Sequence, residues 1–233
     1  EGAPFDFTLH PGEIVGITGL DGQGQADFVR AIAGVQPLLS GRISIIRDTA
    51  AEAVTDLRSA RENGISYVSG DRKKEGIFPN LGIFENMMLP VYRDYRSGGW
   101  LNLINRTKMR PVFEWEAAKL AVKMGAPDNL ITSLSGGNQQ KVVLSKWLFA
   151  DPQVLILDEP TRGIDVGAKF EIYTIMNDLA AQGRGVVMVS SEMPELLGMC
   201  DRIYVMNEGR IVGELSKAEA SQERIMTLIL KNS

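Results

Sequence analysis

The sequence predicts an α/β fold with a mainly parallel sheet, and three observations lead to this class. Apolar runs of strand length alternate along most of the chain with stretches of helical pattern, as in strands joined by crossover helices. One such run passes through the glycine-rich segment GLDGQG directly into a helix. Residues 82–150 break the rhythm and are largely helical, which predicts a helical subdomain inserted between residues 1–81 and 151–233 of the α/β core.

The elements follow from local patterns in chain order. Before the insertion, Gly64 ends a helical stretch and the next apolar run follows it directly. We therefore expect strands at 13–18, 42–46 and 65–69, and helices at 25–33 and 55–63. After the insertion, the turn Asn207-Glu208-Gly209 separates two short runs, which is typical of an antiparallel hairpin at the sheet edge. We expect strands at 154–157, 186–190, 203–206 and 211–214, and helices at 166–181 and 222–230.

The composition indicates a globular protein and excludes some functional classes. Of the 233 residues, 44% are apolar and 23% are charged, which is enough for a full core. The net charge of −4 lacks the basic footprint of a nucleic-acid binder. The one cysteine, Cys200, excludes an intrachain disulfide, and we expect it to be a buried structural thiol. The chain opens without Met in strand-like sequence, so we expect a piece of a longer polypeptide.

The glycine-rich turn resembles the phosphate-binding loop GxxxxGK[ST], whose glycines let backbone N–H groups and a helix N-terminus surround phosphate oxygens. Gln23 lies inside this loop, but Gln25 stands in place of the lysine and Ala26 in place of the hydroxyl that binds magnesium. Asp27 adds a negative charge. Taken alone, a glycine-rich turn without a ligand is an equally good interpretation. The glycines that match are Gly19, Gly22 and Gly24.

Three further motifs resemble the ABC ATPases. LSGGNQQK at 134–141 resembles their signature, VLILDEP at 154–160 their Walker B strand, and residues 161–165 their D-loop, in the same order and spacing. Together with YVSGDRKKEG and DEPTRGIDVGAK, these motifs look like the class of ribose, galactose and xylose importers. In that class one polypeptide carries two nucleotide domains, and the second has an eroded phosphate loop. The resemblance covers nearly the whole chain and implies the ABC type of the P-loop NTPase fold.

The acidic pair has a chemical interpretation of its own. Asp158 ends an apolar strand beside the phosphate loop, where a carboxylate holds Mg²⁺ through water. Glu159 follows and is placed to polarise an attacking water. The resemblance adds ATP as the nucleotide and Asp165 as the D-loop acid. It also implies that the signature completes the active site of a partner domain in trans, through Ser135, Gly136, Gly137 and Gln139.

The sequence departs from the family pattern at several positions. Ser191 stands at the position of the switch histidine, and Gly70 at the position of the Q-loop glutamine. In the family, the aromatic residue that stacks on adenine lies further upstream than this sequence reaches. Phe5 and Phe7 are poor substitutes and are expected to be core residues of a strand. The only histidine, His10, is expected at the surface.

The expected partners are a second nucleotide-binding domain upstream in the same polypeptide, membrane permease subunits and, indirectly, a periplasmic sugar-binding protein, with no nucleic acid. The expected location is the cytoplasmic side of the inner membrane, peripherally bound. One alternative is a regulatory module that binds nucleotide without hydrolysis. Another is an ABC ATPase of DNA repair or translation, but the chain lacks the coiled-coil insertion and basic arms of that class. A cluster in the insertion either docks a membrane subunit or forms local core: Phe84, Met87, Met88, Tyr92 and Tyr95.

Overall fold

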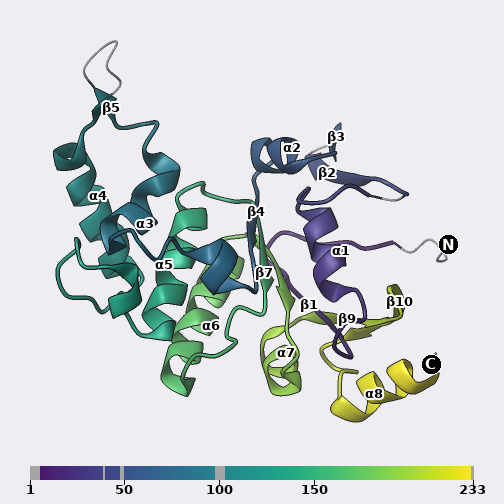
Figure 1. Cartoon of the computed structure of the whole chain (residues 1–233). Helices are drawn as coiled ribbons and strands as arrows, with labels where there is room; N and C mark the ends of the chain where they lie inside the picture. Colours follow the sequence, from purple (N-terminus) through teal and green to yellow (C-terminus); the bar gives the residue numbers. More distant parts are fainter. Residues whose placement is uncertain (1–5, 39, 48–49, 98–102, 232–233) are drawn as a thin grey trace. The chain divides into compact units, whose positions relative to one another are not determined.

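The computed structural model describes residues 6–38, 40–47, 50–97 and 103–231. The chain folds into two compact units (Figure 1). We call them the sheet unit (residues 1–67, 152–160 and 176–233) and the helical unit (residues 68–151 and 161–175). The subdomain boundaries predicted at residues 82 and 150 stay predictions.

A six-stranded sheet forms the centre of the sheet unit, with strand order β10-β9-β1-β8-β7-β4 (Figure 1). β1 pairs in parallel with β8 and β9, β7 pairs in parallel with β8, and β10 runs antiparallel to β9 at the edge. The predicted parallel sheet with an antiparallel edge is thereby confirmed. The strands are β1 (Ile14–Gly19), β4 (Ile65–Val68), β7 (Val154–Asp158), β8 (Gly185–Val189), β9 (Arg202–Asn207) and β10 (Arg210–Ser216).

Helices cover both faces of this sheet. Ile17 of β1 belongs to a buried core shared with Val29 of helix α1 (Gln25–Ile32). Gly16, its neighbour, lies against Leu196 and Cys200 around helix α7 (Met193–Met199). Successive strand residues point to opposite faces, so α1 and α7 lie on opposite sides of β1. Cys200 is buried, as predicted.

Some elements differ from the sequence expectations. The strand expected at 42–46 is β2 (Ile43–Arg47), which pairs with the unpredicted β3 (Ala50–Val54) in a separate two-stranded sheet. β3 escaped prediction because four of its five residues are exposed and it lacks an alternating apolar pattern. The helix after it is shorter than expected, α2 (Leu57–Glu62), because Asp56 caps its start. The closing helix is α8 (Gln222–Lys231).

The helical unit packs three helices around a methionine-rich and aromatic core. Phe84, Met87 and Met88 are buried on helix α3 and Phe113 on helix α4, so the core interpretation of the first three is confirmed. Phe84 and Phe113 lie with ring centroids 5.1 Å apart. The segment Ser97-Gly98-Gly99, whose glycines predict an interruption of the helical pattern, lies largely outside the described residues. The elements are η1 (Arg72–Gly76, a π-helical turn), α3 (Ile83–Met88), η2 (Leu89–Val91), β5 (Arg96–Ser97), β6 (Leu103–Ile104), α4 (Arg106–Lys119), η4 (Ile131–Ser133), α5 (Gly136–Leu148) and the first part of α6 (Val166–Ala181).

The hydropathy of the helices bears on whether any of them could span a membrane. Among the helices that the structure describes, none combines the length and the apolar character needed to cross a bilayer.

Candidate functional site

The glycine-rich loop joins the end of β1 to the start of α1 in the sheet unit. Its close backbone packing explains Gly19, because a Cβ there would lie 2.4 Å from the carbonyl oxygen of Met206 on β9. Gly22 and Gly24 have φ of 76° and 97°, which favour glycine. Gly24 caps α1 without a side-chain hydrogen bond. The loop therefore has the backbone form that its glycine pattern predicts.

The turn between β9 and β10 holds this loop in place. The Gln23 side-chain oxygen accepts a hydrogen bond from the Glu208 backbone N–H at 2.5 Å, and the Gln23 carbonyl accepts from the Gly209 N–H at 2.9 Å. A Cβ on Gly24 would lie 3.1 Å from the Cα of Gly209. Sequence reasoning missed these contacts, because they require the hairpin to be placed next to the loop. Gln23 therefore anchors the glycine-rich loop to the turn between β9 and β10.

Gln25 and Asp27 lie at the start of α1, next to the glycine-rich loop. The Gln25 amide donates to the carbonyl of Leu20 at 2.8 Å, and its nitrogen lies 2.5 Å from where a Cβ of Gly19 would be. A neutral amide thus folds back over the loop. Asp27 lies in the first turn of α1, where its negative charge compensates the positive end of the helix dipole. Ala26 is exposed and offers no oxygen.

The acidic pair lies at the same edge of the sheet. β1, β7 and β8 run parallel, with Ile17 and Asp158 both in register with Val189, so the ends of these strands meet there. The Asp158 carboxylate accepts a hydrogen bond from the Tyr67 hydroxyl at 3.3 Å. Tyr67, on β4, was not predicted as a site residue. The only sequence feature that could have indicated it is a tyrosine hydroxyl within a buried strand.

Glu159 and Ser191, which were predicted separately, lie in direct contact. The Glu159 carboxylate accepts hydrogen bonds from the Ser191 backbone N–H at 2.8 Å and from the Ser191 hydroxyl at 3.2 Å. Glu159 has a φ of 45°, rare for a residue with a side chain, and its own N–H donates to Val189 at 3.0 Å. The pairing of β7 with β8 brings the two residues together. Both hydrogen bonds hold the carboxylate in one orientation.

The residues at this edge fit a magnesium nucleotide poorly. Asp158 supplies one carboxylate, Ala26 supplies no ligand, and Gln25 supplies no charge for the phosphates. No group of three or more His, Cys, Asp or Glu side chains suited to a metal ion occurs in the described ranges. Mg²⁺ with few protein ligands depends on the nucleotide's own phosphates.

The signature motif begins helix α5 in the helical unit. Ser135 is the N-cap, and its hydroxyl accepts from the Asn138 side chain at 2.9 Å and, more weakly, from the Asn138 backbone N–H at 3.4 Å. The Gln139 amide turns back to the carbonyl of Leu134 at 3.1 Å. The first turn of α5 contains no acidic residue. Its N–H groups and dipole therefore present a positive end with no acid of the helix itself to balance it.

The D-loop residue predicted at 165 lies beside the signature within this unit. The Asp165 carboxylate accepts from the Ala168 N–H at 2.9 Å and so caps α6. A Cβ on Gly137 would lie 2.3 Å from the Cβ of Ala168, so α5 and α6 touch at a position that only glycine allows. Gly70 lies between β4 and η1. Phe7 packs against Phe28 and the core, outside any strand, and Phe5 lies outside the described residues.

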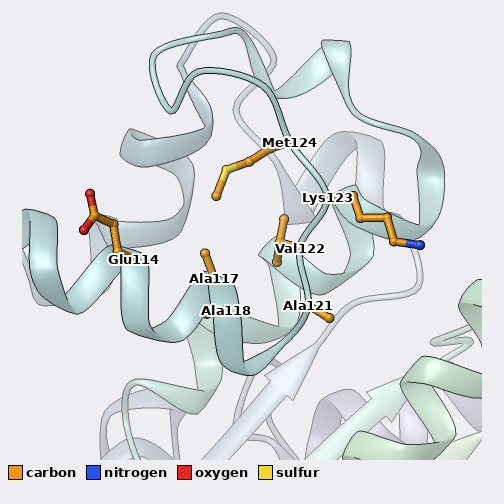
Figure 2. A pocket seen from close by; sticks show the side chains of 7 residues that line it. All are labelled: Glu114, Ala117, Ala118, Ala121, Val122, Lys123 and Met124. Atoms are coloured by element: carbon orange, nitrogen blue, oxygen red, sulfur yellow. The ribbon is translucent and has the colours of Figure 1, made fainter.

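A buried lysine fixes the middle of the signature helix. The Lys141 ammonium donates to the carbonyl of Ala121 at 2.7 Å and forms an ion pair with Glu171 of α6. Near it, a hollow of about 410 Å³ opens at the end of α4, and Figure 2 shows Met124 pointing into it and Lys123 away from it. This hollow is mostly apolar and offers no group suited to a phosphate. Its lining residues are Glu114, Ala117, Ala118, Ala121, Val122, Lys123 and Met124.

Comparison with known proteins gives the same picture. The family model described as ABC transporter matches residues 3–162. The chain is 46% identical to the ribose import ATP-binding protein RbsA of Bacillus licheniformis, over 96% of this chain and 44% of that protein. It is 47% identical to the L-arabinose transport ATP-binding protein AraG of Geobacillus stearothermophilus, over 98% of this chain and 44% of that protein. The chain thus spans less than half the length of these relatives.

Solved structures show the same fold. The ATP-binding cassette MJ0796, in a dimeric post-hydrolysis state bound to ADP and Pi, matches with a TM-score of 0.74 at 21% identity, over 91% of this chain and 88% of that one. The ATP-binding cassette MJ1267 of an ABC transporter matches with a TM-score of 0.73 at 20% identity, over 94% and 88% of the two chains. The predicted fold class is confirmed.

Proposed function

The chain belongs to the ABC transporter family, and from this premise we propose that it is one nucleotide-binding domain of a bacterial sugar importer whose signature serves the active site of a partner domain. The names of the relatives support sugar import, with ribose or arabinose as the class of cargo. Their length, more than twice that of this chain, supports a second nucleotide domain in the same polypeptide. Permease subunits and the cytoplasmic face of the inner membrane are part of this proposal.

One observation supports the proposal that the partner domain, and not this one, is the main site of ATP hydrolysis. The two helix starts that would meet nucleotide phosphates differ in charge: Asp27 lies in the first turn of α1, and no acid lies in that of α5. An anion is repelled at the first start and attracted at the second. We therefore assign weak ATP and Mg²⁺ binding to this domain's own loop. The assembled protein hydrolyses ATP chiefly at the loop of the partner.

The signature residues would act on the phosphate that is transferred. Ser135 and the backbone N–H groups of Gly136 and Gly137 begin a fixed helix, so they need no rearrangement when charge develops on a phosphoryl group. Gln139 stabilises the start of the signature through the hydrogen bond from its side-chain amide to the Leu134 carbonyl. At this domain's own nucleotide site, Glu159 would act as the general base that polarises the attacking water, and Ser191 would hold its carboxylate in place. Asp158 would be the weak metal ligand. Gly70 and Ser191 replace the groups that the family uses to sense the nucleotide.

The test compares two variants in the complete transporter, with ATPase rate and sugar uptake as readouts. Ser135→Arg is expected to lower the ATPase rate by about a hundredfold to a thousandfold, since losing one preorganised phosphate donor costs that much. Glu159→Gln keeps the side-chain size and is expected to cost far less, because its own site contributes little turnover. Unfolding temperatures of both variants serve as the control for folding.

The opposite result would contradict the proposal. If Glu159→Gln abolished turnover and Ser135→Arg preserved it, this domain would hydrolyse ATP itself. If neither variant changed turnover while nucleotide still altered uptake, the chain would be a regulatory module that binds without hydrolysis. The replacements at Gln25, Ala26 and Ser191 are what keep this second function in consideration.

A further inference from the structure

Arg72 lies beside the signature within the helical unit. It opens the π-helical turn η1, and its Nη2 atom lies 3.3 Å from where a Cβ of Gly136 would be. Gly136 is the first residue of α5. A guanidinium group thus touches the helix start that we assign to phosphate binding, although the two residues are 64 positions apart in sequence.

The position of Arg72 is fixed by contacts between η1 and α5. The Lys146 ammonium, on α5, donates to the carbonyl of Gly76 at the end of η1. A Cβ on Gly76 would lie 3.1 Å from a methyl of Val143 and 3.3 Å from the Cγ of Arg72. Burial lowers the pKa of Lys146 to about 8, which indicates how deeply this anchor lies. The geometry of Arg72 at the signature therefore follows from packing inside one unit.

The guanidinium has no anionic partner in the part of the chain that the structure describes. Its Nε atom is buried without a hydrogen bond, and none of its nitrogens forms an ion pair or hydrogen bond with a described residue. The neighbouring carboxylate, Asp71, is engaged elsewhere: it accepts from the Lys74 N–H at 3.1 Å and pairs with the Lys74 ammonium at 3.4 Å. Burial lowers the pKa of Arg72, but a guanidinium stays protonated at any physiological pH.

This arrangement is electrostatically unfavourable as it stands. The N-terminus of a 13-residue helix carries partial positive charge, and Arg72 adds a full positive charge beside it. No acid lies in the first turn of α5, and the carboxylate beside it, Asp165, accepts from the Ala168 N–H and lies 3.8 Å from where a Cβ of Gly137 would be. That carboxylate does not pair with Arg72, so the guanidinium stays without an anionic partner among the described residues. An unpaired, partly buried cation costs stability unless a ligand neutralises it. The ligand must be an anion with several acceptor oxygens, because both the N–H groups and the guanidinium donate.

We propose that Arg72 is a phosphate-binding residue that joins Ser135 and the first N–H groups of α5 in holding the terminal phosphate of the nucleotide bound by the partner domain. This inference rests on the proposed function of the signature. The planar guanidinium suits the purpose, since it donates two parallel hydrogen bonds to phosphate oxygens. It makes binding depend on the terminal phosphate, so the site discriminates ATP from ADP.

The test measures equilibrium binding of AMP-PNP and of ADP to the complete transporter, with Arg72→Gln, Arg72→Lys and the control Lys73→Gln. Lys73 is the adjacent, exposed cation of η1. Arg72→Gln is expected to weaken AMP-PNP binding by about tenfold or more, the loss of a charge-assisted hydrogen bond, and to leave ADP binding unchanged. Arg72→Lys should fall between, because it keeps the charge but loses the paired donors. Lys73→Gln should match the wild type.

Ser135→Arg in the same assay separates the two hypotheses. If Ser135→Arg weakens AMP-PNP binding and Arg72→Gln does not, the role of Arg72 is refuted and the proposed function stands. If neither variant affects AMP-PNP binding, the proposed service in trans fails. If Arg72→Gln weakens AMP-PNP and ADP binding equally, Arg72 is structural and the inference is overturned. Should Arg72→Gln not fold, the ratio of AMP-PNP affinity to ADP affinity in Arg72→Lys decides: a lower ratio than in the wild type supports the inference, and an unchanged ratio overturns it.

Discussion

The start of α1 and the start of α5 are built on the same plan and differ in their electrostatics. α1 follows a glycine-rich turn, whereas α5 follows Leu134 and Ser135 and has Gly136 and Gly137 as its first residues. Each leaves unpaired N–H groups at a helix N-terminus. At α1 a glycine caps the helix, Gln25 folds back on Leu20, and Asp27 supplies a negative charge. At α5 Ser135 caps the helix, no acid follows, and Arg72 lies against Gly136.

The difference shows that backbone form and anion affinity are separate properties. The loop at α1 keeps its glycines because the turn of β9 and β10 packs on it, as the short approaches at Gly19 and Gly24 indicate. Those contacts persist whether or not a phosphate binds. If this loop is the phosphate loop that we propose, it has lost its charged groups and kept its shape. The start of α5 keeps donors and positive charge together, as our proposal of a phosphate ligand requires.

The largest expected effect comes from giving α1 the chemistry that it lacks. This chain as it stands should bind Mg-ATP about tenfold to a few hundredfold more weakly than an intact loop does. The triple variant Gln25→Lys, Ala26→Ser, Asp27→Thr should recover much of that affinity, because it adds a charge-assisted contact and a metal ligand and removes repulsion. Isothermal titration calorimetry on both proteins measures the change.

The same triple variant should not hydrolyse ATP rapidly. Ser191 holds Glu159 through two hydrogen bonds, and Gly70 has no side chain to contact the metal or the nucleophile. A steady-state ATPase assay checks this. Rapid turnover by the triple variant would show that Ser191 and Gly70 do not limit hydrolysis. Low-micromolar binding of Mg-ATP by the unmodified chain would refute the expectation that the loop at α1 binds nucleotide weakly.

The next effect concerns how the two helix starts are anchored. Lys141 ties α5 to Ala121 and Glu171, whereas the α1 loop is held by backbone contacts to the hairpin. Lys141→Met should lower the free energy of unfolding by about 1–3 kcal/mol, less than for a fully buried pair because Glu171 is 41% exposed. Urea unfolding measures it, with the exposed Lys123→Met as control. Equal stability of both variants would show that the lysine is not an anchor.

A nearly isosteric change at α5 tests its charge, and it also replaces the Asn138 amide that donates to the Ser135 hydroxyl with a carboxylate to which that hydroxyl can donate. Asn138 lies in the first turn, and Asn138→Asp would place there the kind of acid that Asp27 is in α1. We expect the ATPase rate of the complete transporter to fall by about tenfold or more, through repulsion of the phosphate. The melting temperature should hold or rise, because an acid stabilises a helix start. Asn129→Asp, exposed elsewhere in the helical unit, is the control, and an unchanged rate for Asn138→Asp would contradict the model.

Much of the fold was predictable, because it depends on local pattern. The runs that became β1, β7 and β8 are continuous and buried, and α6 begins and ends where its sequence predicts. β3 and α7 were missed: β3 is mostly exposed, and α7 is a seven-residue helix whose start carries Pro194 and has no capping side chain. Motif spacing likewise placed Asp158, Glu159 and Ser135 at the ends of their elements.

The contacts of the site were less predictable, because they join distant segments. Ser191 reaches Glu159 only when β7 pairs with β8, and Gln23 reaches the hairpin only when β9 lies beside β1. Arg72 reaches Gly136 because η1 packs on α5, and no local pattern encodes that approach. Sequence patterns supplied the candidate groups, and tertiary packing decided which of them meet.

The smallest expected effect isolates the charge of the α1 start. Asp27→Asn removes one negative charge from the first turn and keeps the side-chain shape. Binding of ATP to this chain should strengthen about twofold to fivefold, the range of a charge–dipole interaction at an exposed helix end. The melting temperature should fall slightly, because the helix loses the acid that stabilises its start. The gain in ATP affinity and the fall in melting temperature have the same cause, because the carboxylate that stabilises the helix start without ligand also repels the anion. Titration calorimetry at low and high salt measures the affinity, and the gain should shrink at high salt through screening. An affinity gain that survives high salt would assign the effect to shape and remove charge from the comparison.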